Sequence, residues 1–185
     1  MRRGARQSQI VNNFFTFVTI VIMSVVLTFY VKYIVKEDKP TRINSGLVCQ
    51  QNIKTTDKIF NQNALKLGYN LLNKGFYVLD GGIIPSINKE STITKELNLN
   101  QINNIFLNTI AINLSKDNQR FLKIKYELIE NDDENSHHAG SLLSSFRVNN
   151  KEIFRMLTDF NKNDISEISM RIQCTMEAFK YNATQ

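Results

Sequence analysis

The residue types that bind metal ions gather in one acidic stretch, residues 131–140 (NDDENSHHAG). The only two histidines of the chain, His137 and His138, are adjacent there, after two aspartates and a glutamate. Zinc sites space their ligands along the chain, whereas neighbouring side chains of an extended segment point to opposite sides. No spaced partners follow, so we expect a solvated loop, with weak Ca²⁺ or Zn²⁺ binding as the alternative.

The chain contains two cysteines, Cys49 and Cys174. If they lie outside the cytoplasm, the compartment permits a disulfide between them. Such a bond would tie the beginning of a domain to its last element and would close a long loop, which stabilises a fold in the chain-entropy model. The alternative is a pair of buried free thiols, and the sequence leaves both interpretations open.

Catalytic motifs are missing from the sequence. Nucleophilic catalysis needs an activated serine or cysteine beside a base, and the only imidazoles lie in the acidic stretch. The patterns G-x-S-x-G, G-x-G-x-x-G, C-x-x-C and H-E-x-x-H are absent. Asp80-Gly81-Gly82 is not followed by the Lys-Ser/Thr of a phosphate-binding loop, and it is typical of a hairpin turn. We therefore expect a protein that is not an enzyme, with no catalytic, cofactor-binding or metal-binding residue, no cofactor and no small-molecule substrate.

The most apolar stretch runs from Phe14 to Val31 and contains no charge, glycine or proline. A membrane-spanning helix needs roughly 20 apolar residues, and the flanking residues extend this stretch to about residue 35. A buried helix of a soluble protein would normally show a polar stripe. A cleaved signal peptide has a shorter apolar region and a small-residue cleavage site. We interpret the stretch as an uncleaved signal anchor in a lipid bilayer.

Positive charge is concentrated around the predicted span. Of the net charge of +6, residues 1–42 carry +5 and residues 43–185 carry only +1. The domain therefore lacks the basic stripe of a nucleic-acid-binding protein, and we expect no nucleic acid partner. The short N-terminal segment with Arg2, Arg3 and Arg6 favours a cytoplasmic N-terminus. We expect a single-pass protein of the bacterial inner membrane with a periplasmic C-terminal domain.

The chain divides into four parts by composition. We expect a short cytoplasmic tail at 1–13, the transmembrane anchor at 14–35, a linker at 36–54 and an extracytoplasmic α+β domain at 55–185. Pro40 and Gly46 interrupt any helix in the linker. About 140 residues suffice for one domain with its own core.

The first half of the domain shows helical and strand signals in turn. Phe60, Ala64, Leu67 and Leu71 recur at helical spacing and predict a helix at 56–74. Two short strands, 76–80 and 83–87, should flank the Gly81-Gly82 turn. Residues 89–104 fit either a short helix or a loop. We then expect an antiparallel hairpin of strands 105–114 and 120–130, because Leu122, Ile124, Tyr126 and Leu128 alternate with polar residues.

The second half is harder to assign. Residues 141–148 predict a strand. Ile153, Phe154, Leu157 and Phe160 favour a helix, with a second hairpin strand as the alternative. The apolar residues of 164–181 fit both the helical spacing and the alternation of a strand. The alternation of apolar and polar residues is the closer match, so we favour a strand. The predicted fold class is α+β: a single N-terminal transmembrane helix, then one domain with a mainly antiparallel sheet and one or two packed helices.

The stretch LNTIAINLSKDNQRFLKIKYELIEND (107–132) resembles the start of the domain of flagellar basal-body-associated FliL-type proteins. Asn113-Leu114 and Arg120-Phe121-Leu122-Lys123 stand where that family has its strand-pair pattern. The resemblance implies a short cytoplasmic tail, one span, a linker, a periplasmic strand pair and a place around the stator units of the flagellar motor. It transfers no functional residue, and the unit at 56–87 lies outside the family's pattern.

These observations favour a non-enzymatic structural or assembly subunit of an envelope-spanning machine: a secretion system, a pilus or the flagellar motor. Its expected partners are the lipid bilayer, other subunits of the complex and its own copies in a homo-oligomer. The alternative is a viral or cell-surface membrane protein for adhesion to cells or penetration into them. A disulfide, and glycans at the N-x-S/T patterns of Asn113 or Asn182, would favour that alternative.

Overall fold

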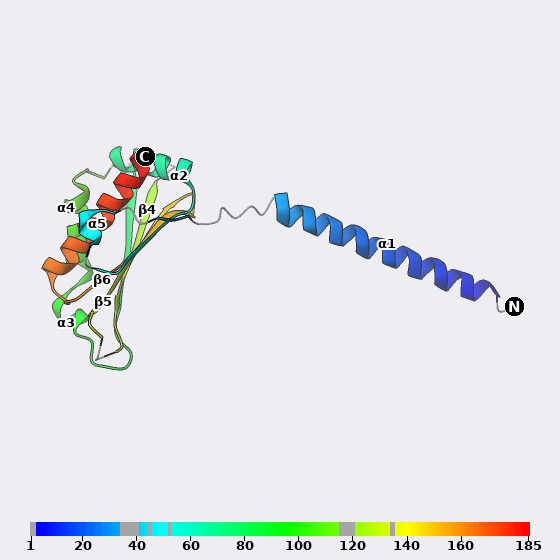
Figure 1. Cartoon of the computed structure of the whole chain (residues 1–185), viewed down its shortest axis with the longest axis horizontal. Helices are drawn as coiled ribbons and strands as arrows, with labels where there is room; N and C mark the ends of the chain where they lie inside the picture. The colour runs from blue at the N-terminus through cyan, green and yellow to red at the C-terminus, as the bar shows by residue number, and fades with distance from the viewer. Residues whose placement is uncertain (1–2, 34–40, 44–45, 52, 115–120, 134–135) are drawn as a thin grey trace. The chain divides into compact units, whose positions relative to one another are not determined.

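Figure 1 shows the computed structural model, which describes residues 3–33, 41–43, 46–51, 53–114, 121–133 and 136–185. The chain forms two compact units, Met1–Asp38 and Lys39–Gln185. The first contains helix α1 (Arg3–Tyr33), and the second is an α+β domain.

Helix α1 is long and apolar enough to cross a membrane by its length and composition. The window Asn13–Tyr30 has a mean hydropathy of 1.9 and coincides with the predicted span, Phe14 to Val31. Three hydroxyl groups inside it donate to the helix's own carbonyl oxygens: Thr19 to Phe15, Ser24 to Ile20 and Thr28 to Ser24, at 2.7–2.9 Å. These bonds satisfy the hydroxyl groups within the helix itself. The helix begins at Arg3, so the described part of the predicted tail at 1–13 is helical and continuous with the apolar stretch.

The domain is built on one mixed six-stranded sheet in the order β1-β2-β6-β5-β4-β3. All neighbours are antiparallel except β3 and β4, which run parallel. The strands are β1 (Thr41–Ile43), β2 (Thr55–Ile59), β3 (Tyr77–Ile84), β4 (Leu122–Glu130), β5 (Gly140–Val148) and β6 (Lys151–Phe160).

Helices cover one face of this sheet, as Figure 1 shows. Those that pack on it are α2 (Gln62–Asn73), α4 (Leu99–Ile110) and α5 (Ile165–Thr184), whereas α3 (Ile93–Glu96) and the 3₁₀ helix η1 (Val48–Gln50) are single turns. The domain thus has three packed helices rather than the one or two predicted.

Aromatic rings fill the space between the helices and the sheet. Tyr126 of β4 stacks on Phe106 of α4 with ring centroids 4.5 Å apart, and Phe146 of β5 stacks on Phe179 of α5 at 4.3 Å. All four side chains are inaccessible to solvent. The alternating apolar residues predicted for β4 (Leu122, Ile124, Tyr126 and Leu128) are fully buried as well, so the strand assignment of 122–130 is confirmed.

The predicted hairpin of 105–114 with 120–130 is wrong. Residues up to Ile110 belong to α4, and β4 pairs instead with β3 and β5. A capping box in which Asn98 and Gln101 bond each other's backbone starts this helix. Ile102, Phe106 and Ile110 then repeat at helical spacing and are buried, which outweighs the β-branched composition.

The predicted turn at Gly81-Gly82 is also wrong. Strand β3 runs straight through both glycines in register with β4, and Gly81 lies opposite Tyr126. A Cβ atom on Gly81 would lie 2.0 Å from the Tyr126 ring. The glycine therefore makes room for an aromatic ring of the core, a tertiary reason that the local sequence does not reveal.

Three further boundaries differ from the prediction. Residues 55–59, expected as the first turn of a helix, form β2 and pair with β6. Residues 153–160 belong to strand β6, which was the alternative, after an Asn149-Asn150 turn with φ values of 52° and 61°. Residues 164–181, expected as a strand, form α5, capped by Asp164 at the Glu167 N–H.

The predicted linker at 36–54 is shorter than expected. Thr41–Ile43 pair with β2, and η1 packs against α5, so both belong to the domain. Residues 36–40, 44–45 and 52 of the predicted linker lie outside the described residues.

Candidate interaction surface

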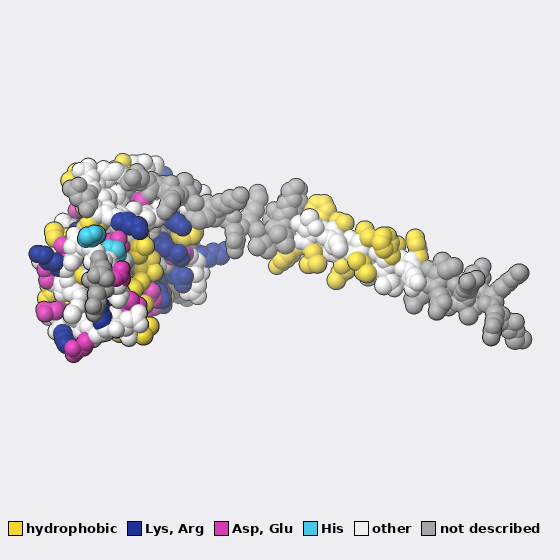
Figure 2. Space-filling model, turned by 60° about the horizontal axis from the view of Figure 1, so that its bottom comes forward, with side chains coloured by type: hydrophobic (Ala, Val, Ile, Leu, Met, Phe, Trp, Pro, Cys, Tyr) yellow, Lys and Arg dark blue, Asp and Glu magenta, His cyan; other side chains and the backbone are white. Residues whose placement is uncertain are grey.

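The face of the sheet opposite the helices is a candidate interaction surface, which we call the open face. Within the described residues, no helix lies over it. Figure 2 shows Lys and Arg side chains beside hydrophobic and acidic ones on the sheet side of the domain. The strand register and the burial pattern assign to the open face the residues Lys58, Val78, Asp80, Ile84, Lys123, Lys125, Glu127, Leu143, Arg147, Glu152, Arg155 and Leu157.

Ion pairs on this face link side chains of neighbouring strands and side chains along one strand. Lys123 Nζ lies 2.7 Å from Asp80 Oδ2 across β4 and β3. The Asp80 pKa is lowered chiefly by its hydrogen bond to Lys123. On β6, Arg155 Nε donates to Glu152 Oε1 at 2.8 Å. Such partly exposed pairs add little to stability, but they fix where charge is displayed.

Two cations of the open face remain without an acidic partner in the described part of the chain, Lys58 and Arg147. The Nε atom of Arg147 is buried and has no hydrogen-bond partner among the described residues. Arg147 also lines a shallow hollow of about 100 Å³ with Lys125, Arg155 and the carboxylates that pair with them, Glu127 and Glu152. The hollow is lined by three cations and two carboxylates, and guanidinium groups bind carboxylates well, so this part of the face suits an acidic partner.

A second hollow lies between two helices on the other side of the domain. Its volume is about 460 Å³, and it is lined by residues of α4 and α5. Amide and hydroxyl side chains such as Asn108, Thr109 and Gln173 form its walls, and the buried Met176 also lines it. Glu177 and Lys180 of α5 line this groove as well, so its walls are polar and carry both signs of charge.

Glu130, at the end of β4, is a buried carboxylate of the domain, with 4% of its surface exposed. Its oxygens accept hydrogen bonds from the segment that follows β3: Ser86 N–H, Ser91 Oγ, and both the N–H and Oγ1 of Thr92, at 2.6–3.1 Å. Burial by itself would raise the pKa of Glu130, but these donors outweigh it and lower the pKa to about 2. The carboxylate thus clamps the 86–92 segment to the sheet and is already saturated with donors, so its role is structural.

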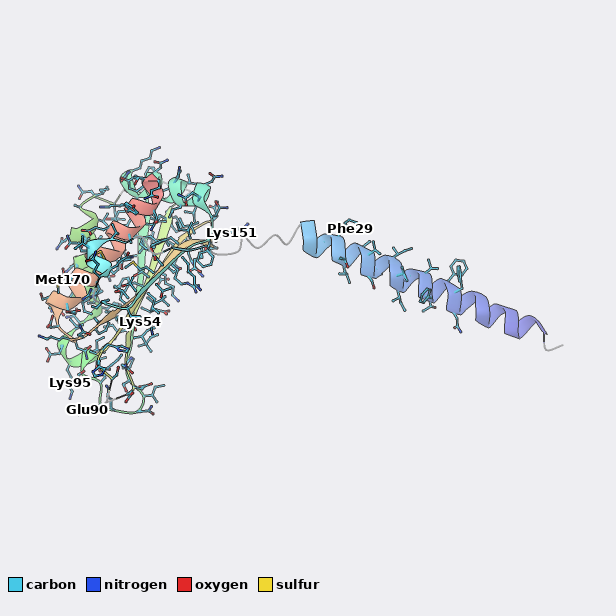
Figure 3. The ribbon with its side chains drawn as sticks, viewed as in Figure 1. Phe29, Lys54, Glu90, Lys95, Lys151 and Met170 are labelled. Carbon is cyan, nitrogen blue, oxygen red and sulfur yellow. A yellow bond between two sulfur atoms is a disulfide. The ribbon has the colours of Figure 1, made fainter. Side chains whose placement is uncertain are left out.

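Asp132 extends this clamp. It accepts from Ser86 Oγ at 2.6 Å and from the Ile87 N–H at 2.9 Å, and the Ser86 bond is the main reason why its pKa is lowered. At the same end of the domain, Glu90 and Lys95 form an ion pair of 2.7 Å (Figure 3). No sequence motif pointed to the clamp, because its donors and acceptors lie about 40 residues apart in the chain.

The two cysteines form a disulfide. Cys49 of η1 is bonded to Cys174 of α5, with Cα atoms 5.6 Å apart. The bond joins the first residues of the domain to its last helix, which is the arrangement that the sequence left open.

The predicted loop around the histidines contains no metal site in its described part. His137 is exposed, and His138 Nδ1 lies 3.1 Å from Ser136 Oγ. Among the described residues no group of three His, Cys, Asp or Glu side chains could hold a metal ion. Glu134 lies outside the described residues.

The two N-x-S/T asparagines differ in accessibility. Asn113 is exposed, whereas Asn182 is 4% exposed and donates from Nδ2 to the Ala178 carbonyl. A glycan at Asn182 is incompatible with that packing.

No family model and no curated sequence matches this chain.

Proposed function

We propose that the chain is a bitopic membrane protein whose domain lies outside the cytoplasm and acts as a non-enzymatic structural or assembly subunit of an envelope-spanning machine. The observation that carries this proposal is the Cys49–Cys174 disulfide, which lies in a domain that directly follows an apolar helix. Disulfides persist in oxidising compartments, and a signal anchor would deliver the domain there.

The attachment of the chain to the domain supports a tethering role. After α1, the chain pairs with the sheet through β1 and is bonded to the helical layer through Cys49. A force applied through the anchor is therefore distributed to the sheet and to α5. This arrangement suits a subunit that holds partners at a membrane surface.

The open face supports the proposed contacts with other proteins. It combines exposed apolar side chains, such as Leu157 at 36% exposure, with two cations that have no acidic partner among the described residues, Lys58 and Arg147. Mixed apolar and basic surfaces rich in arginine are typical of protein interfaces. We therefore expect a protein partner with acidic groups opposite β2, β5 and β6.

Among the machines considered, the structure gives the flagellar motor no special support. The FliL-type resemblance rests on residues 107–132, which were expected to form a strand pair. They contain the end of α4 and strand β4 instead. The proposal is therefore kept at the level of an envelope machine, with a secretion system or a pilus as equal candidates.

The test of the location is a thiol-trapping experiment in intact cells. Cells are quenched in acid, and membranes are alkylated with a maleimide-polyethylene glycol reagent before or after reduction. We expect the protein in the carbonate-resistant membrane fraction, with two tags only after reduction. Cys174→Ser is the control, which should take one tag without reduction. Two tags on the unreduced wild type, or a protein in the soluble fraction, would overturn the proposal.

A viral or cell-surface adhesion protein is the second candidate, and the disulfide favours it equally. Its distinguishing feature would be a glycan at the exposed Asn113, since Asn182 is buried. A shift in gel mobility after treatment with a glycosidase, lost in Asn113→Gln, would favour this candidate over the machine subunit.

A further inference from the structure

Strand β3 forms one edge of the sheet and is eight residues long. Its only strand partner in the described part of the chain is β4. Long edge strands are templates for pairing with another chain, and proteins usually protect them with prolines, bulges or covering segments. Within the described residues, β3 has none of these between Tyr77 and Ile84, and the first proline follows the strand at position 85.

The outward-facing backbone groups of β3 follow from its parallel register. The Leu122 N–H donates to the Phe76 carbonyl at 2.8 Å, and bonds to β4 then alternate along the strand. Even-numbered residues thus bond to β4, whereas the N–H and C=O groups of Leu79, Gly81 and Ile83 point away from the sheet. Within the described residues, these groups have no hydrogen-bond partner.

We propose that β3 pairs with β3 of a second copy of this chain, antiparallel and centred on Gly81. In this register, residues whose numbers add to 162 lie opposite each other. The sequence VLDGGII at 78–84 is then self-complementary. Val78 lies opposite Ile84, Leu79 opposite Ile83, and Asp80 opposite Gly82 of the other copy.

The neighbouring registers are less favourable, which is why the sequence points to a second copy. Centring on residue 80 would place the two Asp80 carboxylates opposite each other, and centring on residue 79 would place Val78 opposite Asp80. Centring on residue 82 would place Leu79, inside the strand, opposite Pro85, which has no N–H to donate, whereas the Gly81 register places Pro85 opposite only the first residue of the strand, Tyr77. Only the Gly81 register pairs every apolar residue with an apolar residue and separates the charges.

The proposed contact buries side chains that are exposed in one copy. Val78 is 42% exposed and Ile84 is 44% exposed, both on the open face. The three hydrogen-bonded residue pairs would exchange roughly six backbone bonds. Pairing would also join the two open faces into one continuous surface, since the sheets would become one.

A second copy of the chain would be one of the protein partners proposed above, so the pairing of β3 rests on the proposed function. Its test uses purified protein, so a failure of self-pairing is distinguishable from a failure of the membrane role, which thiol trapping reports separately.

The experiment measures the protein mass of the full chain in detergent by size-exclusion chromatography with light scattering, over a range of concentrations. We expect a dimer of the 21.4 kDa chain. Val78→Lys and Ile84→Glu, made singly, should each raise the dimer dissociation constant at least about tenfold, because each breaks two apolar pairs per dimer. The double variant should regain the dimer, because each lysine then faces a glutamate of the other copy.

Leu157→Lys is the matched control, since it changes an exposed apolar residue of the open face on an interior strand. It should leave the dimer intact. A monomeric wild type, or a dimer unaffected by either single variant, would overturn the proposal; the second result would assign the dimer to other contacts, such as those of α1. A folded double variant that stays monomeric would overturn the register.

Discussion

Replacing Glu130 by glutamine tests the clamp that holds the 86–92 segment to the end of β4. The ordinary pKa of the glutamate is 4.5 and the folded-state value is about 2. Each pH unit between them is worth about 1.4 kcal/mol, so the fold favours the carboxylate by about 3 kcal/mol. We therefore expect Glu130→Gln to lower the free energy of unfolding by about 2–3 kcal/mol at pH 7, because the amide cannot replace an ionised acceptor of several donors.

The free energy of unfolding should also depend on pH in a definite direction. A folded-state pKa below the ordinary value contributes stability that is fully present above pH 4.5 and is lost as the pH falls through 2. The wild type should therefore lose stability over that range, and the variant should lose less. The difference between the two proteins should shrink as the solution is acidified.

Urea unfolding of the full chain in detergent, followed by the near-ultraviolet circular dichroism of the buried tyrosines, measures both quantities. Glu127→Gln is the matched control: it lies on the same strand, but its carboxylate pairs with Lys125 on the open face. That change should cost less than about 1 kcal/mol. Equal urea midpoints for the Glu130 and Glu127 variants at pH 7 would refute the reasoning.

Three further predictions concern the core and the disulfide. Gly81→Ala should lower the free energy of unfolding by at least about 2 kcal/mol, because its Cβ would lie 2.0 Å from the Tyr126 ring, whereas Gly82→Ala meets nothing within 4 Å and should be nearly neutral by urea unfolding. Reduction of the disulfide should lower the unfolding free energy by up to about 5 kcal/mol, since the bond spans 125 residues; an unchanged midpoint with reductant would contradict this. Burial raises the pKa of Tyr126 to about 12, so its share of the stability should be lost as the pH rises from 10 through 12, and ultraviolet titration of Tyr126→Phe should lack that late-ionising phenol.

The sequence predicted best where a pattern depended only on neighbouring residues. Alternation of apolar and charged residues identified β4, and continuous hydrophobicity identified α1. The signal of β4 is strong because one of its faces lies entirely in the core. The signal of α1 is strong because a helix in lipid, as proposed here, is apolar on all sides.

The sequence failed where tertiary contacts decided between two local preferences. Residues 165–184 carry both periods, and the helix forms because Ile168, Ile172 and Phe179 are buried together on its packed side. The cap at Asp164 was a local signal for that helix, and the capping box at Asn98 was another for α4. The strand prediction for 164–181 came from alternation and that for 105–114 from apolar, β-branched residues, and both patterns are weaker indicators than capping.

The candidate surface was predictable only in part. The outward lysines of β4 were expected from alternation, but the open face also needs β2 and β6 beside β4 and β5, and these neighbours come from distant parts of the chain. The Glu130 clamp and the β3 edge could not be predicted, because each depends on which strands lie next to each other.

Photocrosslinking in native membranes tests the central claim most directly, that the open face contacts other proteins at a membrane. A photoreactive amino acid is placed at Leu143, in the hollow of the open face, or at the control position Met170, which is 50% exposed on α5 (Figure 3). We expect the photoreactive group at position Leu143 to give a discrete adduct with another protein, and the group at Met170 to give none. Irradiation that gives no protein adduct at Leu143, or the same adducts at both positions, would contradict it.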